Sequence, residues 1–298
     1  DTILSTQTVC QQTPSSATSL VVNNVTGGIN NTYDYQWYQN TSPTPTTVGS
    51  NSPVFTPPTN AVGTFEYYCV ISNTPNSTGC EYTTNLHTMI VNPAPIVNTP
   101  NQNVNICEGG SVTPLFVQPN GPGTITYEWF ENTSPTPTSV GTNSTYTPPT
   151  SVTGTFEYYC VVTFSSGGCN NVQSSIITIT IDPDPSIIVS PLSYQNICEG
   201  GSIANPLNIT VSGGVGTISY QWYQNTSPTP TTVGNNPTFD PGILTTIGIY
   251  EYYVEVDYNG NGCDATTSAI AQIDVVADPI ADTILSTQTV CQQTPSSA

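Results

Sequence analysis

A marker of fifteen residues occurs three times along the chain, and its spacing sets the size of the folding unit. The copies are YQWYQNTSPTPTTVG at 35–49, YEWFENTSPTPTSVG at 127–141 and YQWYQNTSPTPTTVG at 220–234. The tryptophans within them lie 92 and 93 residues apart. A unit of about 92 residues is too long for a solenoid repeat and fits one independently folding β-sandwich.

A second, longer period overlies the first. Residues 1–17 recur without change at 282–298, an offset of 281 residues, whereas the three units differ from one another. We therefore expect a parent protein that repeats three-unit blocks, with this chain an internal segment of it that begins at Asp1 without a leader. The predicted domains are 1–93, 94–183 and 184–279, followed at 280–298 by the start of the next block.

Alternating apolar residues separated by turn residues predict strands throughout, and no stretch has a helical period. In the second unit the pattern predicts strands A to G, with E as a short strand after C′. The expected ranges are 95–107 for A, 112–118 for B, 126–131 for C, the neighbourhood of 140 for C′, 144–147 for E, 156–164 for F and 169–181 for G.

Two repeated features point to an immunoglobulin-like core. Each unit places a Trp on strand C, where such sandwiches bury one against the opposite sheet. Each also carries a Tyr two residues before a Cys or Val on strand F, the pattern of a tyrosine corner. The predicted fold is all-β, with three tandem immunoglobulin-like sandwiches in a rod and the first strand of a fourth. The predicted core residues are Trp37, Trp129, Trp222, Tyr67, Tyr158 and Tyr252.

The charge composition excludes several functions. The chain has no Lys or Arg and 19 Asp and Glu, a net charge of −19, which repels nucleic acid and anionic membranes. No apolar run approaches the ~20 residues that span a bilayer, so no membrane insertion is expected. The 17 Tyr, 7 Phe and 3 Trp argue against disorder.

Candidate catalytic and metal sites are weak. His87 is the only histidine, and it aligns with Ile177 and Ile273 of the other units, which indicates a core or edge position rather than a catalytic one. We expect no enzyme and no cofactor. Calcium at the domain junctions is an alternative to solvated charge for the acidic residues there, namely Glu108, Asp182, Asp184, Glu199, Asp278 and Asp282.

Two further motifs bear on modification and on the joints. The three Asn-Thr-Ser triplets, which begin at Asn40, Asn132 and Asn225, match N-glycan acceptors, but a turn after strand C explains them as well. The linkers Pro93-Ala94-Pro95 and Pro183-Asp184-Pro185 restrict the backbone at alternate residues, which predicts stiff joints.

The motifs as a set resemble those of the tandem Ig-like repeats in giant surface adhesins of the Bacteroidota. They are ICEGG at 106–110 and 197–201, QWYQN, a TPPT stretch followed by YYCVV, and a Gly-Cys pair after the F–G turn. The resemblance covers the whole chain and extends to gliding-motility adhesins secreted by the type 9 system. It implies an extracellular, cell-surface location, and it marks Thr2 and Thr283, each in an Asp-Thr-Ile triplet, as O-glycan acceptors. Resemblance to antibody domains implies a strand-B cysteine, which is missing here: 116 and 117 are Phe and Val.

Nine cysteines in an extracellular chain should mostly be paired. Each unit has a strand-A cysteine (Cys10, Cys107 and Cys198, with Cys291 repeating Cys10) and an F–G cysteine (Cys80, Cys169 and Cys263). The F-strand cysteines Cys69 and Cys160 are replaced by Val254 in the third unit, so we expect them to be buried free thiols.

Two pairings remain open. The A-strand end and the F–G turn of one sandwich lie at opposite poles, about 30 Å apart for strands of ~9 residues, too far for a disulfide. Pairing between consecutive sandwiches gives Cys10–Cys169 and Cys107–Cys263, and leaves Cys198 for the next block. A shorter strand A permits the intradomain set, which is Cys10–Cys80, Cys107–Cys169 and Cys198–Cys263.

The sequence favours a structural stalk or filament segment, stiffened by its linkers and disulfides. Its expected partners are further copies of the same repeat in cis, and lateral self-assembly into fibres is also expected. The alternative is a module that binds a glycan or a receptor through its B–C and F–G loops.

Overall fold

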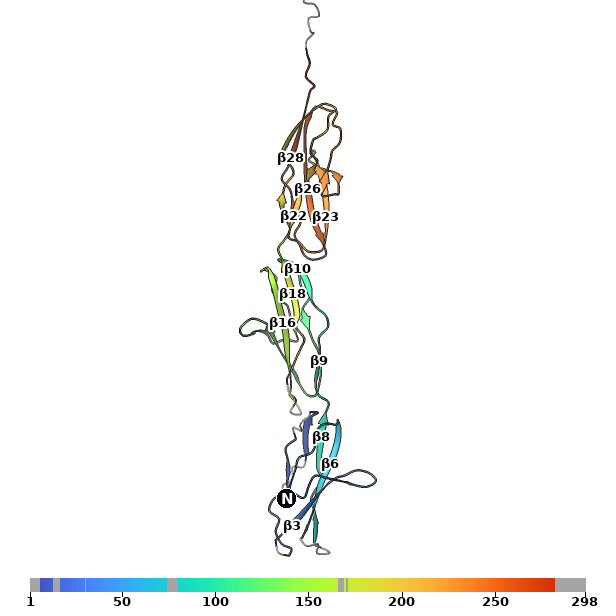
Figure 1. The fold of residues 1–298 in the computed structure, drawn as a ribbon, viewed down its shortest axis with the longest axis vertical. Coiled ribbons are helices and arrows are strands. Elements are labelled where there is room, and N and C mark those ends of the chain that lie inside the picture. The colour runs from blue at the N-terminus through green and yellow to red at the C-terminus, as the bar shows by residue number, and fades with distance from the viewer. Residues whose placement is uncertain are drawn as a thin grey trace, which may run out of the picture. The chain divides into compact units, whose positions relative to one another are not determined.

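The computed structural model describes residues 6–12, 17–29, 31–73, 80–165, 169 and 171–281. Over these residues the regular elements are all β-strands (Figure 1). The chain forms two compact units, one of 1–104, 112–149 and 154–180, and the other of 105–111, 150–153 and 181–298. In the described part of the chain no helix has the length and apolar character needed to cross a bilayer.

The first sandwich consists of a large sheet and a two-stranded sheet. The large sheet has the order β1-β8-β6-β3-β4, with β7 also paired to β6, and the small one pairs β2 with β5. β1 runs parallel to β8, whereas the other pairs are antiparallel. The strands are β1 (Thr6–Cys10), β2 (Leu20–Val21), β3 (Tyr33–Gln39), β4 (Thr46–Val48), β5 (Val54–Phe55), β6 (Gly63–Asn73), β7 (Glu81–Thr83) and β8 (His87–Asn92).

The second sandwich repeats this plan. Its large sheet has the order β10-β18-β16-β13-β14, with β17 on β16, and two small sheets pair β11 with β15 and β12 with β9. The strands are β9 (Ile96–Asn98), β10 (Val104–Cys107), β11 (Leu115–Phe116), β12 (Gln118–Asn120), β13 (Ile125–Glu131), β14 (Thr138–Gly141), β15 (Thr145–Tyr146), β16 (Gly154–Phe164), β17 (Val172–Gln173) and β18 (Ile177–Asp182).

The third sandwich has the same order of strands. Its large sheet is β20-β28-β26-β23-β24 with β27 on β26, and the small sheets pair β21 with β25 and β19 with β22. The strands are β19 (Ser186–Val189), β20 (Tyr194–Cys198), β21 (Leu207–Asn208), β22 (Thr210–Ser212), β23 (Thr217–Gln224), β24 (Thr231–Gly234), β25 (Thr238–Phe239), β26 (Gly248–Asn259), β27 (Thr266–Thr267) and β28 (Ala271–Val276). The prediction of tandem immunoglobulin-like sandwiches is confirmed. From residue 282 onward, the predicted start of a fourth lies outside the described residues.

Each core is built around the repeated tryptophan. The three Trp side chains are fully buried, and the three Tyr side chains of strand F are at most 2% exposed. Each Trp indole N–H donates to a backbone carbonyl 2.8–3.0 Å away, so the burial leaves its polar atom bonded. Between each Trp and Tyr lies one aromatic ring from the opposite sheet: Phe55, Tyr146 or Phe239.

Two predicted strands of the second unit are divided. The expected strand over 95–107 is wrong, because β9 and β10 are separate strands in different sheets. Pro100, which has no N–H to donate to a ladder, lies in the gap. The expected strand over 112–118 begins late, at Leu115 after Pro114, and ends at Phe116; β12 follows from Gln118.

The predicted last strand, 169–181, is also interrupted, between β17 and β18. At the break the Ser174 N–H donates to the Cys160 carbonyl at 2.8 Å, and the Ser174 hydroxyl accepts from the Cys160 N–H at 2.9 Å. Thr84 and Ser268 make the same pair of bonds with Cys69 and Val254. At each break a Ser or Thr hydroxyl takes the place of the backbone carbonyl that an unbroken strand G would supply. The buried backbone N–H of strand F therefore still has a hydrogen-bond acceptor.

Candidate structural site: disulfides between consecutive sandwiches

The first disulfide joins Cys10 to Cys169. Cys10 ends β1, and parallel pairing with β8 brings it level with Asn92, where the chain leaves the first sandwich. Cys169 lies in the F–G turn of the second sandwich, between β16 and β17. The two Cα atoms are 5.1 Å apart, within the range a disulfide spans.

The second disulfide repeats this arrangement one sandwich further along. Cys107, at the end of β10, is bonded to Cys263 in the F–G turn of the third sandwich, with Cα atoms 4.8 Å apart. The two bonds close loops of similar length, with sequence separations of 159 and 156. The same register therefore operates at both junctions.

Of the two pairings left open by the sequence, the structure contains the set between consecutive sandwiches. Cys80 and Cys198, which the intradomain alternative paired with Cys10 and Cys263, are free thiols in this chain. Cys291 lies outside the described residues.

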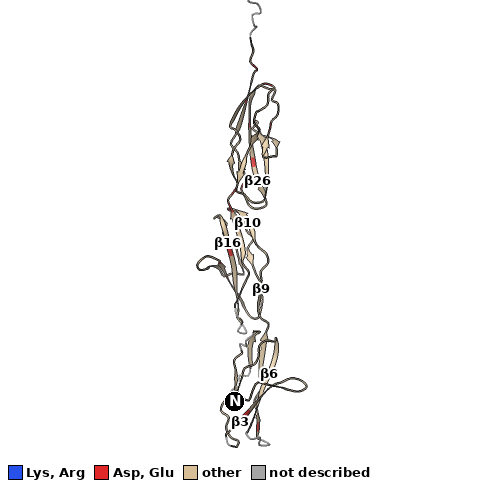
Figure 2. Cartoon of the chain, viewed as in Figure 1, with Lys and Arg blue, Asp and Glu red and all other residues tan. Residues whose placement is uncertain are grey.

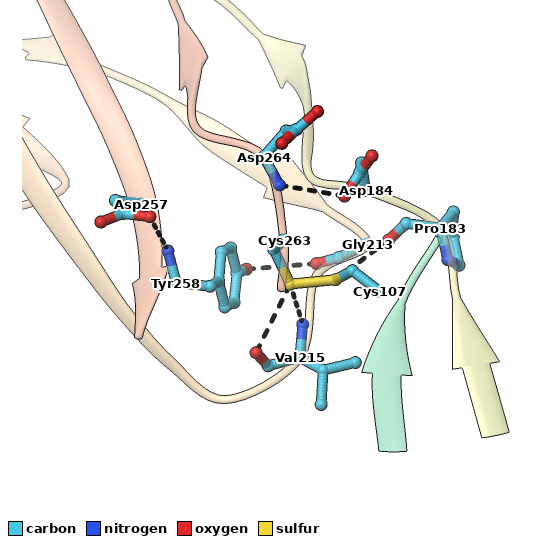
Figure 3. Close-up of a disulfide and its surroundings, with 9 residues drawn as sticks. All are labelled: Cys107, Pro183, Asp184, Gly213, Val215, Asp257, Tyr258, Cys263 and Asp264. Atoms are coloured by element: carbon cyan, nitrogen blue, oxygen red, sulfur yellow. Dashed lines mark hydrogen bonds between the residues drawn. A yellow bond between two sulfur atoms is a disulfide. The ribbon is translucent and has the colours of Figure 1, made fainter. Parts of the chain in front are cut away.

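The second junction fits closely around its disulfide (Figure 3). The Cys107 N–H donates to the Asn261 carbonyl at 3.0 Å. A Cβ added to Gly262 would lie 2.7 Å from the Gly110 Cα, so only glycine allows this approach. The Gly213 backbone is similarly covered by the linker, since a Cβ there would lie 2.6 Å from the Asp184 carbonyl oxygen.

The loops after Cys107 and Cys198 share one conformation. After Cys107, the N–H groups of the next three residues donate to the carbonyls of Asp182, Thr150 and Cys107 at 2.8–3.0 Å. After Cys198, the corresponding N–H groups donate to Val276, Leu244 and Cys198 at 2.8–2.9 Å. The first glycine of each loop has φ +78°, a value that favours glycine. The Glu-Gly-Gly sequence therefore specifies one turn in both places.

Asp184 helps to hold the second junction. Its Oδ1 accepts a hydrogen bond from the Asp264 N–H at 3.1 Å (Figure 3). Potential ligand atoms of Cys107, Cys263 and Asp184 lie within 4.8 Å of one another. The two sulfurs are bonded together, so neither is a thiolate that could bind a metal. At the first linker the equivalent residue is Ala94, so the carboxylate is not part of the shared design.

The F-strand cysteines Cys69 and Cys160 are free thiols, and both are fully buried in the core. Burial raises the pKa of the Cys69 thiol to about 11, and that of Cys160 to about 11. Both thiols are therefore neutral at physiological pH and act as small apolar groups. Val254 occupies the equivalent position in the third sandwich and is equally buried.

His87 and the three Asn-Thr-Ser triplets lie in positions that their contacts within the fold explain. His87 is fully buried on β8, opposite Tyr67 of β6. The Asn40 side-chain amide donates to the Glu66 carboxylate at 2.6 Å, and Asn132 and Asn225 make the equivalent bond at 2.7 Å. Such bonds support the turn explanation of the three triplets. The candidate acceptors Thr2 and Thr283 lie outside the described residues.

Sequence reasoning missed the backbone contacts that surround the disulfides. Asn261 and Gly213 were not singled out, and the Gly-Cys pair was noted only as a family motif, although the residue before every F–G cysteine is glycine, at 79, 168 and 262. A close backbone approach at the junction explains Gly262.

Fold and site together define a tandem immunoglobulin-like repeat protein in which disulfides join consecutive domains. Residues 94–183 match the family described as Ig-like domain CHU_C associated. No curated protein matches the chain.

Solved structures of several consecutive domains are similar to the chain at low identity. Three N-terminal domains of the bacteriophage RB49 Hoc capsid protein are 14% identical, with 88% of this chain and 94% of that chain covered and a TM-score of 0.46. The I67–I69 fragment of titin is 13% identical, with 92% and 96% covered and a TM-score of 0.47. Extracellular domains 3–5 of Drosophila OTK are 11% identical, with 93% and 95% covered and a TM-score of 0.36.

Proposed function

We propose that the chain is a non-catalytic structural segment of an extracellular surface protein, and that it carries tension along a series of disulfide-joined sandwiches. The observation behind this is the register of the two disulfides, each of which joins the strand-A cysteine of one sandwich to the F–G turn of the next. A bond placed there closes the junction and leaves the interior of each sandwich without a disulfide.

Three features support the extracellular and structural parts of the proposal. Disulfides form and persist in oxidising compartments. The linkers Pro93–Pro95 and Pro183–Pro185 are proline-rich rather than flexible. The second sandwich matches an Ig-like domain family, and the motifs resemble those of tandem repeats in surface adhesins, which fits a stalk or filament that holds other domains away from a cell surface.

The alternative, ligand binding through the B–C and F–G loops, is less well supported. At the second junction these loops are occupied by the junction itself: Cys263 is in the disulfide, and Gly213 is covered by the linker. At the first junction Gly121 of the B–C loop lies against Pro95, since a Cβ there would be 2.8 Å from the Pro95 Cβ. Loops used in this way have little surface left for a ligand.

The two disulfides limit how far the chain can extend under load. With both bonds intact, the shortest covalent path from Cys10 to Cys263 crosses to Cys169, returns along the backbone to Cys107 and crosses again. This path contains about 60 residues, or about 210 Å when fully extended. Without the disulfides the same ends are separated by about 250 residues, or about 880 Å.

Single-molecule stretching from the two termini tests the proposal. We expect the oxidised chain, once the backbone under load is fully extended, to reach about one third of the length of the reduced chain, because the residues before Cys10 and after Cys263 add about 45 residues to both paths. Cys10→Ser and Cys107→Ser should each give an intermediate length, with about 95 residues on the path between positions 10 and 263. Cys160→Val, which removes a buried free thiol, should not change the length. An oxidised chain that extends to the reduced length would overturn the proposal, because tension would then bypass the disulfides.

A further inference from the structure

Two free cysteines are accessible to solvent: Cys80, which is half-exposed, and Cys198, which is exposed. One is an F–G cysteine and the other is a strand-A cysteine. Cys198 is a strand-A cysteine with no sandwich following it in the described chain, and Cys80 is an F–G cysteine with no sandwich preceding it. In the two junctions that the structure contains, a strand-A cysteine always bonds the F–G cysteine of the next sandwich. Cys198 and Cys80 are therefore the two halves of a third junction.

We propose that Cys198 of one 281-residue block forms a disulfide with Cys80 of the next copy of the block, and so joins the copies head to tail. The partner is a further copy of this chain's own repeat. The proposal goes beyond the structural role because it names that partner, and it rests on junction geometry whether or not the chain carries tension.

The Cys198 side of the junction is already formed. The loop that follows Cys198 has the three hydrogen bonds of the loop that follows Cys107, and Gly200 and Gly109 share φ +78°. The Cys107 loop is docked on the third sandwich, whereas the described residues contain no sandwich after the Cys198 loop. Its conformation therefore does not depend on docking, and little ordering is needed when a partner binds.

Cys198 and the residue before it are more exposed to solvent than their equivalents at the completed second junction. Cys107 is 0% exposed and Ile106 is 4% exposed. Their equivalents are less covered, since Cys198 is exposed and Ile197 is partly exposed. A thiol and an apolar side chain that are buried at a completed junction are thus open at this one.

The Cys80 side offers a vacant receiving surface. Cys80 borders a hollow of about 250 Å³, which is also lined by Gly27, Tyr33, Asn73 and Tyr82. Gly27 is the equivalent of Gly213 in the third sandwich, and both have positive φ.

The two glycines differ in what lies over them. The linker carbonyls of Pro183 and Asp184 lie 3.0 and 2.6 Å from a Cβ placed on Gly213, whereas a Cβ on Gly27 would meet no atom of the described residues within 4 Å. The segment that would cover Gly27 is 277–279 of the preceding copy, which follows β28 as 183–185 follows β18.

Formation of the bond needs an oxidant, which a small-molecule disulfide such as oxidised glutathione supplies. The exposed Cys198 thiolate attacks this disulfide, and one glutathione thiolate leaves. The Cys80 thiolate then attacks the Cys198 sulfur of the mixed disulfide, and the second glutathione leaves. The two protein thiols lose two protons and two electrons, and one disulfide is reduced to two thiols.

A complementation experiment tests the pairing. All proteins carry Cys291→Ser, because Cys291 repeats the sequence around Cys10. In a glutathione redox buffer we expect the full chain to form a ladder of covalent multimers on a non-reducing gel. Cys198→Ser and Cys80→Ser should each remain monomeric alone, and a mixture of the two should form dimers and nothing larger, since each supplies one half of a single junction.

Peptide mapping with pepsin identifies the bond. When one variant is labelled with ¹⁵N, the dimer should yield a linked pair with a labelled Cys80 peptide and an unlabelled Cys198 peptide, or the reverse with the label exchanged. Cys160→Val, matched to Val254, should leave the ladder unchanged. The proposal is overturned if either single variant dimerises alone, if the mixture stays monomeric while both variants retain Cys10–Cys169 and Cys107–Cys263, or if the ladder contains Cys80–Cys80 links.

Discussion

The centre of strand F shows how much a single position can vary within this core. Cys69, Cys160 and Val254 each lie directly opposite a Trp of strand C, and none is accessible to solvent. A thiol and an isopropyl group are of similar size and are both apolar when neutral. The position therefore requires a small apolar side chain, and a cysteine there serves for its volume.

This equivalence predicts a difference in alkaline stability. The folded-state pKa of Cys160 is raised by burial to about 11, from an ordinary value of 9.0. Between pH 9 and 11 the unfolded thiol ionises while the folded one stays neutral, so the stability of the second sandwich should fall over this interval. Cys160→Val should weaken the fall, as measured by hydrogen exchange of β16 between pH 8.5 and 10.5.

The exposed thiol provides the matched control for that measurement. Cys198→Ser removes a thiol without altering a core, so the alkaline loss of protection in β16 should remain as in the unmodified chain. The burial explanation fails if Cys160→Val and the unmodified chain lose protection equally.

At the scale of single strands, the interruption of strand G depends on one hydroxyl group. The Ser174 hydroxyl accepts the buried Cys160 N–H and donates to the Ser175 carbonyl at 2.9 Å. Ser174→Ala should leave that N–H without a partner and lower the free energy of unfolding by about 1–3 kcal/mol. Urea unfolding of the second sandwich measures the change.

The first sandwich supplies the comparison for this substitution, because it has Thr84 at the same place with the same bonds. Ser174→Thr should retain nearly all of the stability. If alanine and threonine prove equally harmful, the hydroxyl is not what maintains the break.

Sequence reasoning was accurate for strands that alternate and poor where they are interrupted. The expected strands over 126–131 and 156–164 agree with β13 and β16 to within two residues. In β16 the buried side chains recur at every second position, and in β13 half-buried and exposed side chains alternate up to the buried Trp129, which is the signal that alternation provides. The break at Ser174 was missed because a serine whose hydroxyl bonds the next strand looks the same in sequence as one that faces water.

The sequence reduced the number of possible cysteine pairings but did not select one of them. The replacement of an F-strand cysteine by Val254 excluded that position from any shared bond. The choice between pairing within and between sandwiches depends on the distance between two poles. That distance depends on the length of strand A. Its end at Cys107 was predicted correctly, but the break that divides it into β9 and β10 was missed.

For the whole chain, the charge distribution predicts weak dependence on salt. Figure 2 shows scattered acidic residues and no basic ones, in agreement with a composition of 19 Asp and Glu and no Lys or Arg. No Lys or Arg ion pair exists for salt to screen, and acidic residues at 6% of the chain repel one another weakly. The thermal midpoint should change by less than about 3 °C between 20 mM and 0.5 M NaCl.

Calorimetry at the two salt concentrations gives the midpoints. A rise of 10 °C or more would mean that repulsion among the carboxylates is strong in the folded chain and is relieved by screening. The reduced protein, measured under the same conditions, separates this effect from the contribution of the disulfides.

The two covalent loops overlap, and this has a consequence for damage by proteases. One loop runs from residue 10 to 169 and the other from 107 to 263, so each peptide bond between 10 and 263 lies inside at least one of them. A single cut anywhere in this interval leaves both fragments attached to each other. Proteases specific for Lys or Arg find no site at all, and an enzyme of another specificity must cut at least twice before any part of this segment is lost.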